Sequence, residues 1–234
     1  MSPCARSPSG WPLASRPVAC LLVRNKIHQV TVTDLRTVAK PSLEKQGFTW
    51  LNHSSKYIGD RTPFVRKDED HGAVRDYLEE TFGLVKAAVG AQSGCVYDWR
   101  IRENGVVYEN GQPATDPKTS RYYLYAPIGD VHTDFSPRGA LDRIRLHLSV
   151  QEMSDAKQNG LRTILINAWR PLKTVTNAPL AMCDRRTVLK SDIVPVDKVL
   201  AENVEEETCI RHSPSQKWYY LSEQRPEEML LFVQ

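Results

Sequence analysis

The chain has 234 residues, of which 41% are hydrophobic and 25% are charged, and its formal net charge at neutral pH is +3. This composition is typical of a globular protein that buries a core, and the length fits one large domain. No run of five or more lysines and arginines occurs, so neither a nucleic-acid partner nor an anionic-membrane partner is indicated. No apolar run approaches the roughly 20 residues that a transmembrane helix requires.

The cysteines are odd in number and widely spaced, and no two form a Cys-x-x-Cys pair: Cys4, Cys20, Cys95, Cys183 and Cys209. This pattern indicates neither a disulfide framework nor a structural zinc site. A reducing, cytoplasmic location is the simpler expectation.

The first 26 residues contain arginine, serine and proline but no acidic residue, and their longest apolar stretch is too short for a signal-peptide core. We predict that residues 1–26 form a disordered or non-native-like extension, with an organellar targeting segment as the alternative. Residues 27–234 are then expected to form a single domain.

In chain order, residues 27–35 suggest an extended strand. Apolar residues recur at three- and four-residue steps over residues 73–89, which predicts a helix that stops at Gly90. Strict alternation over residues 95–101 predicts a half-buried strand. The dipeptides Asn104-Gly105 and Asn110-Gly111 are typical of turns.

Further short strands are predicted at residues 122–126, 131–135, 163–169, 217–221 and 229–233. Ser136 and Pro137 are typical of a helix start, as N-cap and first helical residue, and the helix is expected to turn Ala140, Leu141, Ile144 and Leu148 inward. Many short strands with few helices predict an α+β or mainly β barrel or sandwich.

His132 and Asp134 are separated by a single residue at the end of an apolar run. Because alternate side chains on a strand point to the same face, both can reach one metal ion. An imidazole and a carboxylate are two of the three ligands in the 2-His-1-carboxylate triad that holds Fe(II) in oxygen-activating enzymes. Taken alone the pair is a common pattern, and an ordinary exposed pair is the alternative.

The pair belongs to a series of sequence blocks, in this order: EKQGFTWLNHSSKY, GCVYDWRIREN, VHTDFSPRGALDRI, NAWRPL, APLAMCDRRTV and QKWYYLSEQRPEEMLLF. Together the blocks resemble the AsaB-type hydroxylase/desaturase family, also described as CmcJ-like, whose members are mostly fungal proteins of secondary metabolism. The resemblance covers residues 28–234. It implies a double-stranded β-helix (jelly-roll) oxygenase barrel with flanking helices. It also implies Fe(II), 2-oxoglutarate as co-substrate, and hydroxylation or desaturation of a small secondary metabolite.

By this resemblance His132 and Asp134 are metal ligands. Arg170, beside Asn167 and Trp169 at the end of a predicted strand, can bind a carboxylate of 2-oxoglutarate or of the substrate. An ion pair with Asp184 is the structural alternative for Arg170. Aromatic side chains can line a substrate pocket or belong to the core: Trp99, Tyr123, Tyr125, Trp169, Trp218 and Tyr220. Arg143 and Arg145 are expected to be helix-face charges.

One departure from the family affects the metal site. In the family, the strand that matches EEMLLF leads into a segment with the second metal histidine and then an arginine, whereas here Gln234 follows that strand. The sequence thus resembles a C-terminally truncated member, with His147 or His212 as poor substitutes for the third ligand. The alternative function is a metal-incompetent remnant, a binding module, or a metal-independent cyclase or dehydratase on the same scaffold. The strand at 229–233 is expected at an exposed edge, where it would permit self-association.

Overall fold

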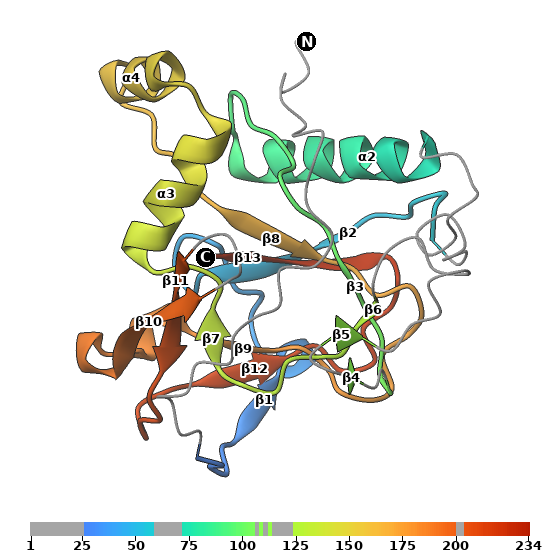
Figure 1. Cartoon of the computed structure of the whole chain (residues 1–234). Helices are drawn as coiled ribbons and strands as arrows, with labels where there is room; N and C mark the ends of the chain where they lie inside the picture. Colours follow the sequence, from blue (N-terminus) through green and yellow to red (C-terminus); the bar gives the residue numbers. More distant parts are fainter. Residues whose placement is uncertain (1–25, 59–71, 106–107, 110–111, 114–123, 200–203) are drawn as a thin grey trace.

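The computed structural model describes residues 26–58, 72–105, 108–109, 112–113, 124–199 and 204–234. The described chain is mixed α+β and mostly β, with small sheets and a few helices (Figure 1). The N-terminal extension predicted for residues 1–26 lies outside the described residues, apart from Lys26. Among the described helices, none is long and apolar enough to cross a bilayer.

Most of the described strands belong to three sheets of three strands each. Their strand orders are β1 (Val32–Asp34), β12 (Trp218–Tyr220), β9 (Ala181–Cys183); β2 (Phe48–Asn52), β13 (Glu228–Val233), β8 (Ile166–Trp169); and β10 (Ile193–Val199), β11 (Val204–Ile210), β7 (His132–Thr133). Two further pairs are β3 (Ile101–Arg102) with β6 (Leu124–Tyr125), and β4 (Tyr108–Glu109) with β5 (Gln112–Pro113). Except for the parallel pairs β1–β12 and β3–β6, all of these pairings are antiparallel.

The main hydrophobic core joins the first two sheets. It is formed by buried residues from or next to strands of both sheets: Leu35, Phe48, Met182, Leu221 and Leu230. The ring of Tyr219 on β12 lies 5.8 Å from that of Phe48 on β2, so side chains of the two sheets meet directly. Complete burial of each such side chain contributes about 1.5–3 kcal/mol to folding.

Strand β13 lies in the centre of its sheet, hydrogen-bonded to β2 on one side and to β8 on the other. Its residues Met229, Leu230 and Leu231 are fully buried. The expectation that residues 229–233 form an exposed edge is therefore wrong. The reason is β2, a strand that the sequence patterns did not predict and that pairs with β13 over five residue positions.

The two predicted helices are confirmed. Helix α2 (Gly72–Val89) ends at Gly90, whose φ of +63° is the left-handed conformation that glycine adopts readily. Helix α3 (Pro137–His147) begins as expected, because the Ser136 hydroxyl accepts a hydrogen bond from the Gly139 N–H at 3.0 Å. In Figure 1, α2 lies beside the sheet of β2, β13 and β8. The guanidinium of Arg170, the residue that follows β8, lies 6.0 Å from the centre of the Tyr77 ring on α2.

Several other local predictions differ from the structure. Residues 95–101 alternate between half-buried and exposed as predicted, yet in the described chain only Ile101 pairs with another strand. Leu141, expected inward on α3, is exposed. Helix α4 (Val150–Gln158), which begins with a capping box of Ser149 and Glu152, was not predicted. The hairpin of β10 and β11 was not predicted either.

Candidate functional site

His132 and Asp134 lie at the edge of the third sheet. His132 is on β7, opposite Cys209 of β11, and Asp134 follows β7 just before the N-cap of α3. The two side chains point to the same side, and the His132 Nε2 atom lies 3.5 Å from the Asp134 Oδ1 atom. The backbone thus brings one nitrogen and one oxygen together at a partly exposed position.

The orientation of the His132 ring is fixed by a hydrogen bond to the backbone of Asp130. Its Nδ1 atom lies 2.8 Å from the backbone oxygen of Asp130, and because a carbonyl only accepts, Nδ1 carries the hydrogen. Nε2 is then the atom that faces Asp134. The hydrogen bond with Asp134 raises the pKa of His132, against the opposing effect of burial. A metal-binding histidine usually donates one ring N–H to a carbonyl or carboxylate and binds the metal through its other ring nitrogen.

Asp134 is held by two side-chain amides. Its Oδ2 atom accepts hydrogen bonds from Asn167 Nδ2 and from Gln234 Nε2, both at 2.9 Å. Its backbone N–H donates to Gln234 Oε1 at 3.0 Å. Burial acts to raise the pKa of Asp134, but the hydrogen bonds from His132 and Asn167 outweigh it and lower the pKa to about 2. Asp134 is therefore a carboxylate at neutral pH, with Oδ1 directed toward His132.

Gln234 was not predicted as a site residue, although its position follows from a simple pattern. On β13, Leu230 and Phe232 face the main core, and Gln234 is the next residue in that two-residue repeat. The Gln234 N–H donates to the Leu165 oxygen at 3.1 Å, which continues the pairing of β13 with β8. The alternation of the strand places Gln234 on this face, but its contact with Asp134 depends on how β13 packs near the end of β7, which no local pattern reveals.

The pair fits a transition-metal ion as two of its protein ligands. Imidazole nitrogen and carboxylate oxygen are suitable donors for Fe(II), and the remaining polar atoms of both side chains are occupied elsewhere. Within the described part of the chain, no third His, Cys, Asp or Glu completes a metal-binding group. His147 lies against the Tyr97 ring with centroids 5.3 Å apart, and His212 stacks on His28 at 4.2 Å. Neither of them joins the pair.

Tyr97 and Arg143 lie near Asp134. Arg143 is paired with Glu205 at 2.6 Å, and its guanidinium carbon lies 5.3 Å from the Phe135 ring and 5.9 Å from the Tyr97 ring. The expectation that Arg143 is a helix-face charge is wrong, because these partners draw it inward until its side chain is 12% exposed. Burial, together with the negative charge of Asp134, raises the pKa of Tyr97 to about 12. The phenol therefore stays protonated and can donate a hydrogen bond.

Arg170 has structural partners in the described chain. Its Nη1 atom donates to the backbone oxygens of His53 at 2.9 Å and Pro226 at 3.3 Å. The alternative of an ion pair with Asp184 is wrong, because Asp184 is bound by Arg186 at 2.5 Å. A role for Arg170 in binding 2-oxoglutarate stays a prediction.

The other predicted binding residues are separated from one another. Trp169 packs against the main core, whereas Asn167, two residues earlier, contacts Asp134. Tyr123 lies outside the described residues.

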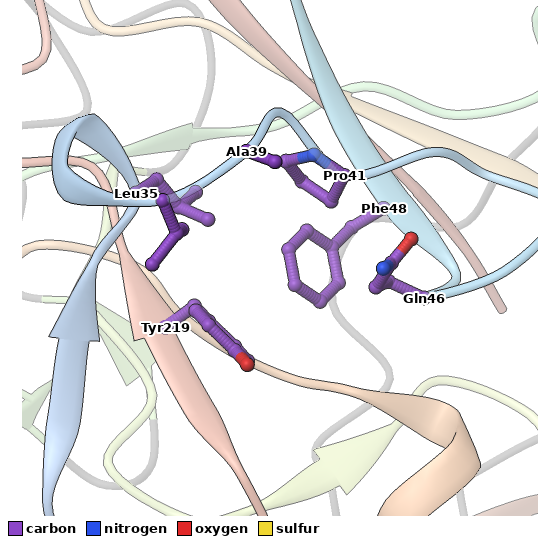
Figure 2. Close-up of a pocket in the computed structure, with 7 residues that line it drawn as sticks. Leu35, Ala39, Pro41, Gln46, Phe48 and Tyr219 are labelled. Atoms are coloured by element: carbon purple, nitrogen blue, oxygen red, sulfur yellow. The ribbon is translucent and has the colours of Figure 1, made fainter.

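A small cavity of about 170 Å³ lies next to the main core (Figure 2), between the short 3-10 helix η1 (Leu35–Thr37), β2 and β12. It is lined mostly by apolar side chains: Leu35, Val38, Ala39, Pro41, Gln46, Phe48 and Tyr219. Neither His132 nor Asp134 lines it, so it is not the predicted metal site.

Comparison with known proteins adds independent information. Residues 16–234 match the family described as "Oxidoreductase/YMDC permease-like domain". The hydroxylase/desaturase efuI of Hormonema carpetanum is 32% identical over 216 residues, which cover 86% of this chain and 69% of that protein. The alpha-ketoglutarate-dependent dioxygenase phiK of a fungal species (strain ATCC 74256) is 25% identical over 210 residues, covering 89% of this chain and 70% of that protein.

A solved structure is also similar. It is that of the iron and alpha-ketoglutarate-dependent endoperoxidase NvfI, with a TM-score of 0.70 and 26% sequence identity. The similarity covers 88% of this chain and 71% of that one.

Proposed function

Because this chain belongs to the fungal hydroxylase/desaturase family of Fe(II)/2-oxoglutarate dioxygenases, we propose that it is itself a non-haem Fe(II)- and 2-oxoglutarate-dependent hydroxylase or desaturase. We propose a small secondary metabolite as substrate, a jelly-roll barrel as the fold, and a cytoplasmic location. The observation that carries the proposal is the convergence of His132 Nε2 and Asp134 Oδ1 at 3.5 Å.

In this proposal Fe(II), together with 2-oxoglutarate and O2, supplies the oxidising power, and the protein supplies geometry and charge. His132 binds through Nε2 because its Nδ1–H is tied to the Asp130 carbonyl. Asp134 binds through Oδ1 and places one negative charge next to the ion. Tyr97, held protonated by burial, donates a hydrogen bond to a bound carboxylate or to the substrate.

The other predicted binding residues make contacts of their own in the structure or lie outside the described residues. Arg170 is retained as a candidate for carboxylate binding, but it would have to leave the carbonyls of His53 and Pro226. Asn167 acts on Asp134 in the described structure. Trp169 and Tyr123 are retained as substrate-pocket candidates.

The proposal is tested by anaerobic titration with Fe(II), then addition of 2-oxoglutarate and a search for the visible charge-transfer band of the ternary complex. We expect a band in the wild-type protein and none in the His132→Ala variant. His212→Ala is the matched control, because His212 stacks on His28 and does not contact Asp134. Wild-type protein without a band, or a band that persists in His132→Ala, contradicts the proposal.

A second candidate is a small-molecule binding module or a metal-independent cyclase or dehydratase on the same scaffold. It is favoured by one observation: no third His, Cys, Asp or Glu joins the pair among the described residues. The two candidates differ in their response to a chelator. Substrate turnover or binding that is unchanged by EDTA supports the second candidate, and formation of succinate from 2-oxoglutarate supports the first.

A further inference from the structure

Gln234 is bonded twice to a single residue, Asp134. Its Oε1 atom accepts from the Asp134 backbone N–H, and its Nε2 atom donates to Asp134 Oδ2. Two bonds from one planar amide fix both the backbone and the side-chain rotation of the aspartate. Asn167 adds a second donor to the same Oδ2 atom.

We propose that Gln234, with Asn167, is a positioning residue that makes Asp134 a one-oxygen ligand, leaving only Oδ1 free beside His132 Nε2. This inference rests on the proposed function, because it concerns the ion that the pair would hold. With two amide donors on Oδ2, binding of an ion through both carboxylate oxygens would cost two hydrogen bonds.

The two amides come from rigid parts of the fold. Asn167 lies on β8, and Gln234 continues β13 through its bond to the Leu165 oxygen at 3.1 Å. Leu230, four residues before Gln234 on the same face, is fully buried in the main core. Support from rigid strands holds a ligand within the narrow tolerance that a metal site needs. Through these bonds the sheet of β2, β13 and β8 fixes the orientation of Asp134, which follows the edge strand β7 of another sheet.

A one-oxygen carboxylate selects among metal ions. Ca(II) prefers six to eight oxygen ligands and often takes both oxygens of a carboxylate, whereas Fe(II) and Co(II) accept fewer ligands and favour imidazole. We therefore expect the Gln234–Asn167 clamp to favour the transition metals over Ca(II). Its removal should weaken Co(II) binding and narrow the difference between Co(II) and Ca(II).

The metal arm of the test compares the variants Gln234→Met and Asn167→Leu with the wild type, using Co(II) and Ca(II) in separate titrations without 2-oxoglutarate. Affinity is measured by titration, and geometry by the visible d–d absorption of bound Co(II). We expect each variant to bind Co(II) about 10-fold more weakly and to show an altered spectrum, as is usual when a partner behind a ligand is lost. Gln216→Met is the matched control, because Gln216 donates to another aspartate, Asp192, at 3.2 Å. It should leave both measurements unchanged.

The metal-free arm separates the clamp from the proposed function. In the wild-type protein the side-chain amide signals of Gln234 and Asn167 are followed by 15N NMR, and both should shift in Asp134→Ala while that of Gln216 does not. Unshifted signals, or Co(II) binding by Gln234→Met equal to that of the wild type, overturn the inference. A third outcome is that the signals shift in Asp134→Ala while the wild-type protein binds no Co(II). This outcome overturns the proposed metal function and the metal role of Gln234. The two amides would then serve only to restrain Asp134.

Discussion

The sheet of β2, β13 and β8 and the sheet of β10, β11 and β7 are built in different ways. In the first, the central strand β13 is paired on both sides and carries three consecutive residues with 0% exposure, Met229, Leu230 and Leu231. In the second, β7 is a two-residue strand at the edge and pairs only with β11. Both candidate metal ligands belong to or follow β7, whereas the amides that hold Asp134 come from the first sheet.

The two sheets differ in how rigid their strands are and in how accessible their side chains are to an ion or a substrate. A fully paired, buried strand is stiff but leaves no room for an ion or a substrate. An edge strand leaves its side chains accessible but is weakly fixed by itself. The side-chain amides of Asn167 and Gln234 reach from the first sheet to Asp134, so this accessible carboxylate is held by rigid strands. We therefore expect substitutions of the buried core residues of the first sheet to lower stability. Substitutions on β7, and of the two amides that reach Asp134, should instead affect binding.

The largest effect is expected from Leu230→Ala. Leu230 is fully buried in the main core on the central strand, so its truncation leaves a cavity with little room to collapse. We expect a loss of about 2–5 kcal/mol in the free energy of unfolding, measured by urea denaturation. Leu146→Ala is the control, because Leu146 is 71% exposed, and its change should stay within about 0.5 kcal/mol. Equal losses in the two variants would break the comparison.

A smaller loss is expected from Gly139→Ala, which tests how closely α3 sits on β11. A β-carbon on Gly139 would overlap the backbone oxygen of Glu206, so the helix and the strand must separate. We expect a loss of about 1–3 kcal/mol in thermal or urea unfolding, as in other overpacked sites.

The matched control for this substitution is Gly83→Ala on α2, where a new β-carbon meets no atom within 4 Å. There the higher helix propensity of alanine should raise stability by about 0.5–1 kcal/mol. Opposite signs for the two glycine substitutions are the expected result. A stabilising Gly139→Ala would show that α3 and β11 are not in close contact.

An intermediate effect that depends on pH is expected at the start of β13. The Glu228 carboxylate is buried and accepts two bonds from the Arg36 guanidinium, at 2.9 Å and 2.8 Å. The hydrogen bond from Arg36 is the main cause that lowers the pKa of Glu228, against the opposing effect of burial. The stabilisation is therefore present above the carboxyl pKa of the unfolded chain, about 4.3, and is lost as the pH falls through the lower folded value.

Arg36→Met should remove this contribution. Because the Arg36 side chain is 37% exposed and screened by solvent, we expect a loss of only about 1–2 kcal/mol at pH 7. The loss should shrink when unfolding is measured below pH ~4. Arg138→Met, at a side chain that is 78% exposed, is the control and should show no such pH dependence. A loss that is equal at all pH values would mean that packing of the Arg36 stem and its hydrogen bond to the Ser222 oxygen, and not the ion pair, stabilise the fold.

Features set by neighbouring residues could be predicted from the sequence. The start of α3 follows from Ser136 and Pro137, and the approach of His132 to Asp134 follows from the two-residue repeat of a strand. Asn167 stands out in the sequence only through its place near Arg170. Its contact with Asp134 depends on the packing of β8 near the end of β7, which the sequence does not reveal.

Features set by residues far apart could not be predicted. The strand expected at residues 95–101 has the alternating burial but, in the described chain, little pairing, because pairing requires a partner that local alternation does not reveal. The sequence indicates a surface position for Arg143, because its partner Glu205 lies 62 residues later and no local pattern points to it. The central place of β13 was missed for the same reason, since it depends on β2.

The smallest effect on stability is expected from His132→Ala, and it makes the comparison sharpest. His132 lies on a two-residue edge strand, its ring is 26% exposed, and its hydrogen bond to the Asp130 oxygen is open to solvent. Its loss should change the free energy of unfolding by less than about 1 kcal/mol, while Co(II) binding is abolished because one of two ligand atoms is gone. Urea denaturation and Co(II) titration of the same sample measure both quantities. If His132→Ala instead lowered stability as much as Leu230→Ala, β7 would be part of the structural core, and the division between a rigid sheet and an accessible edge would fail.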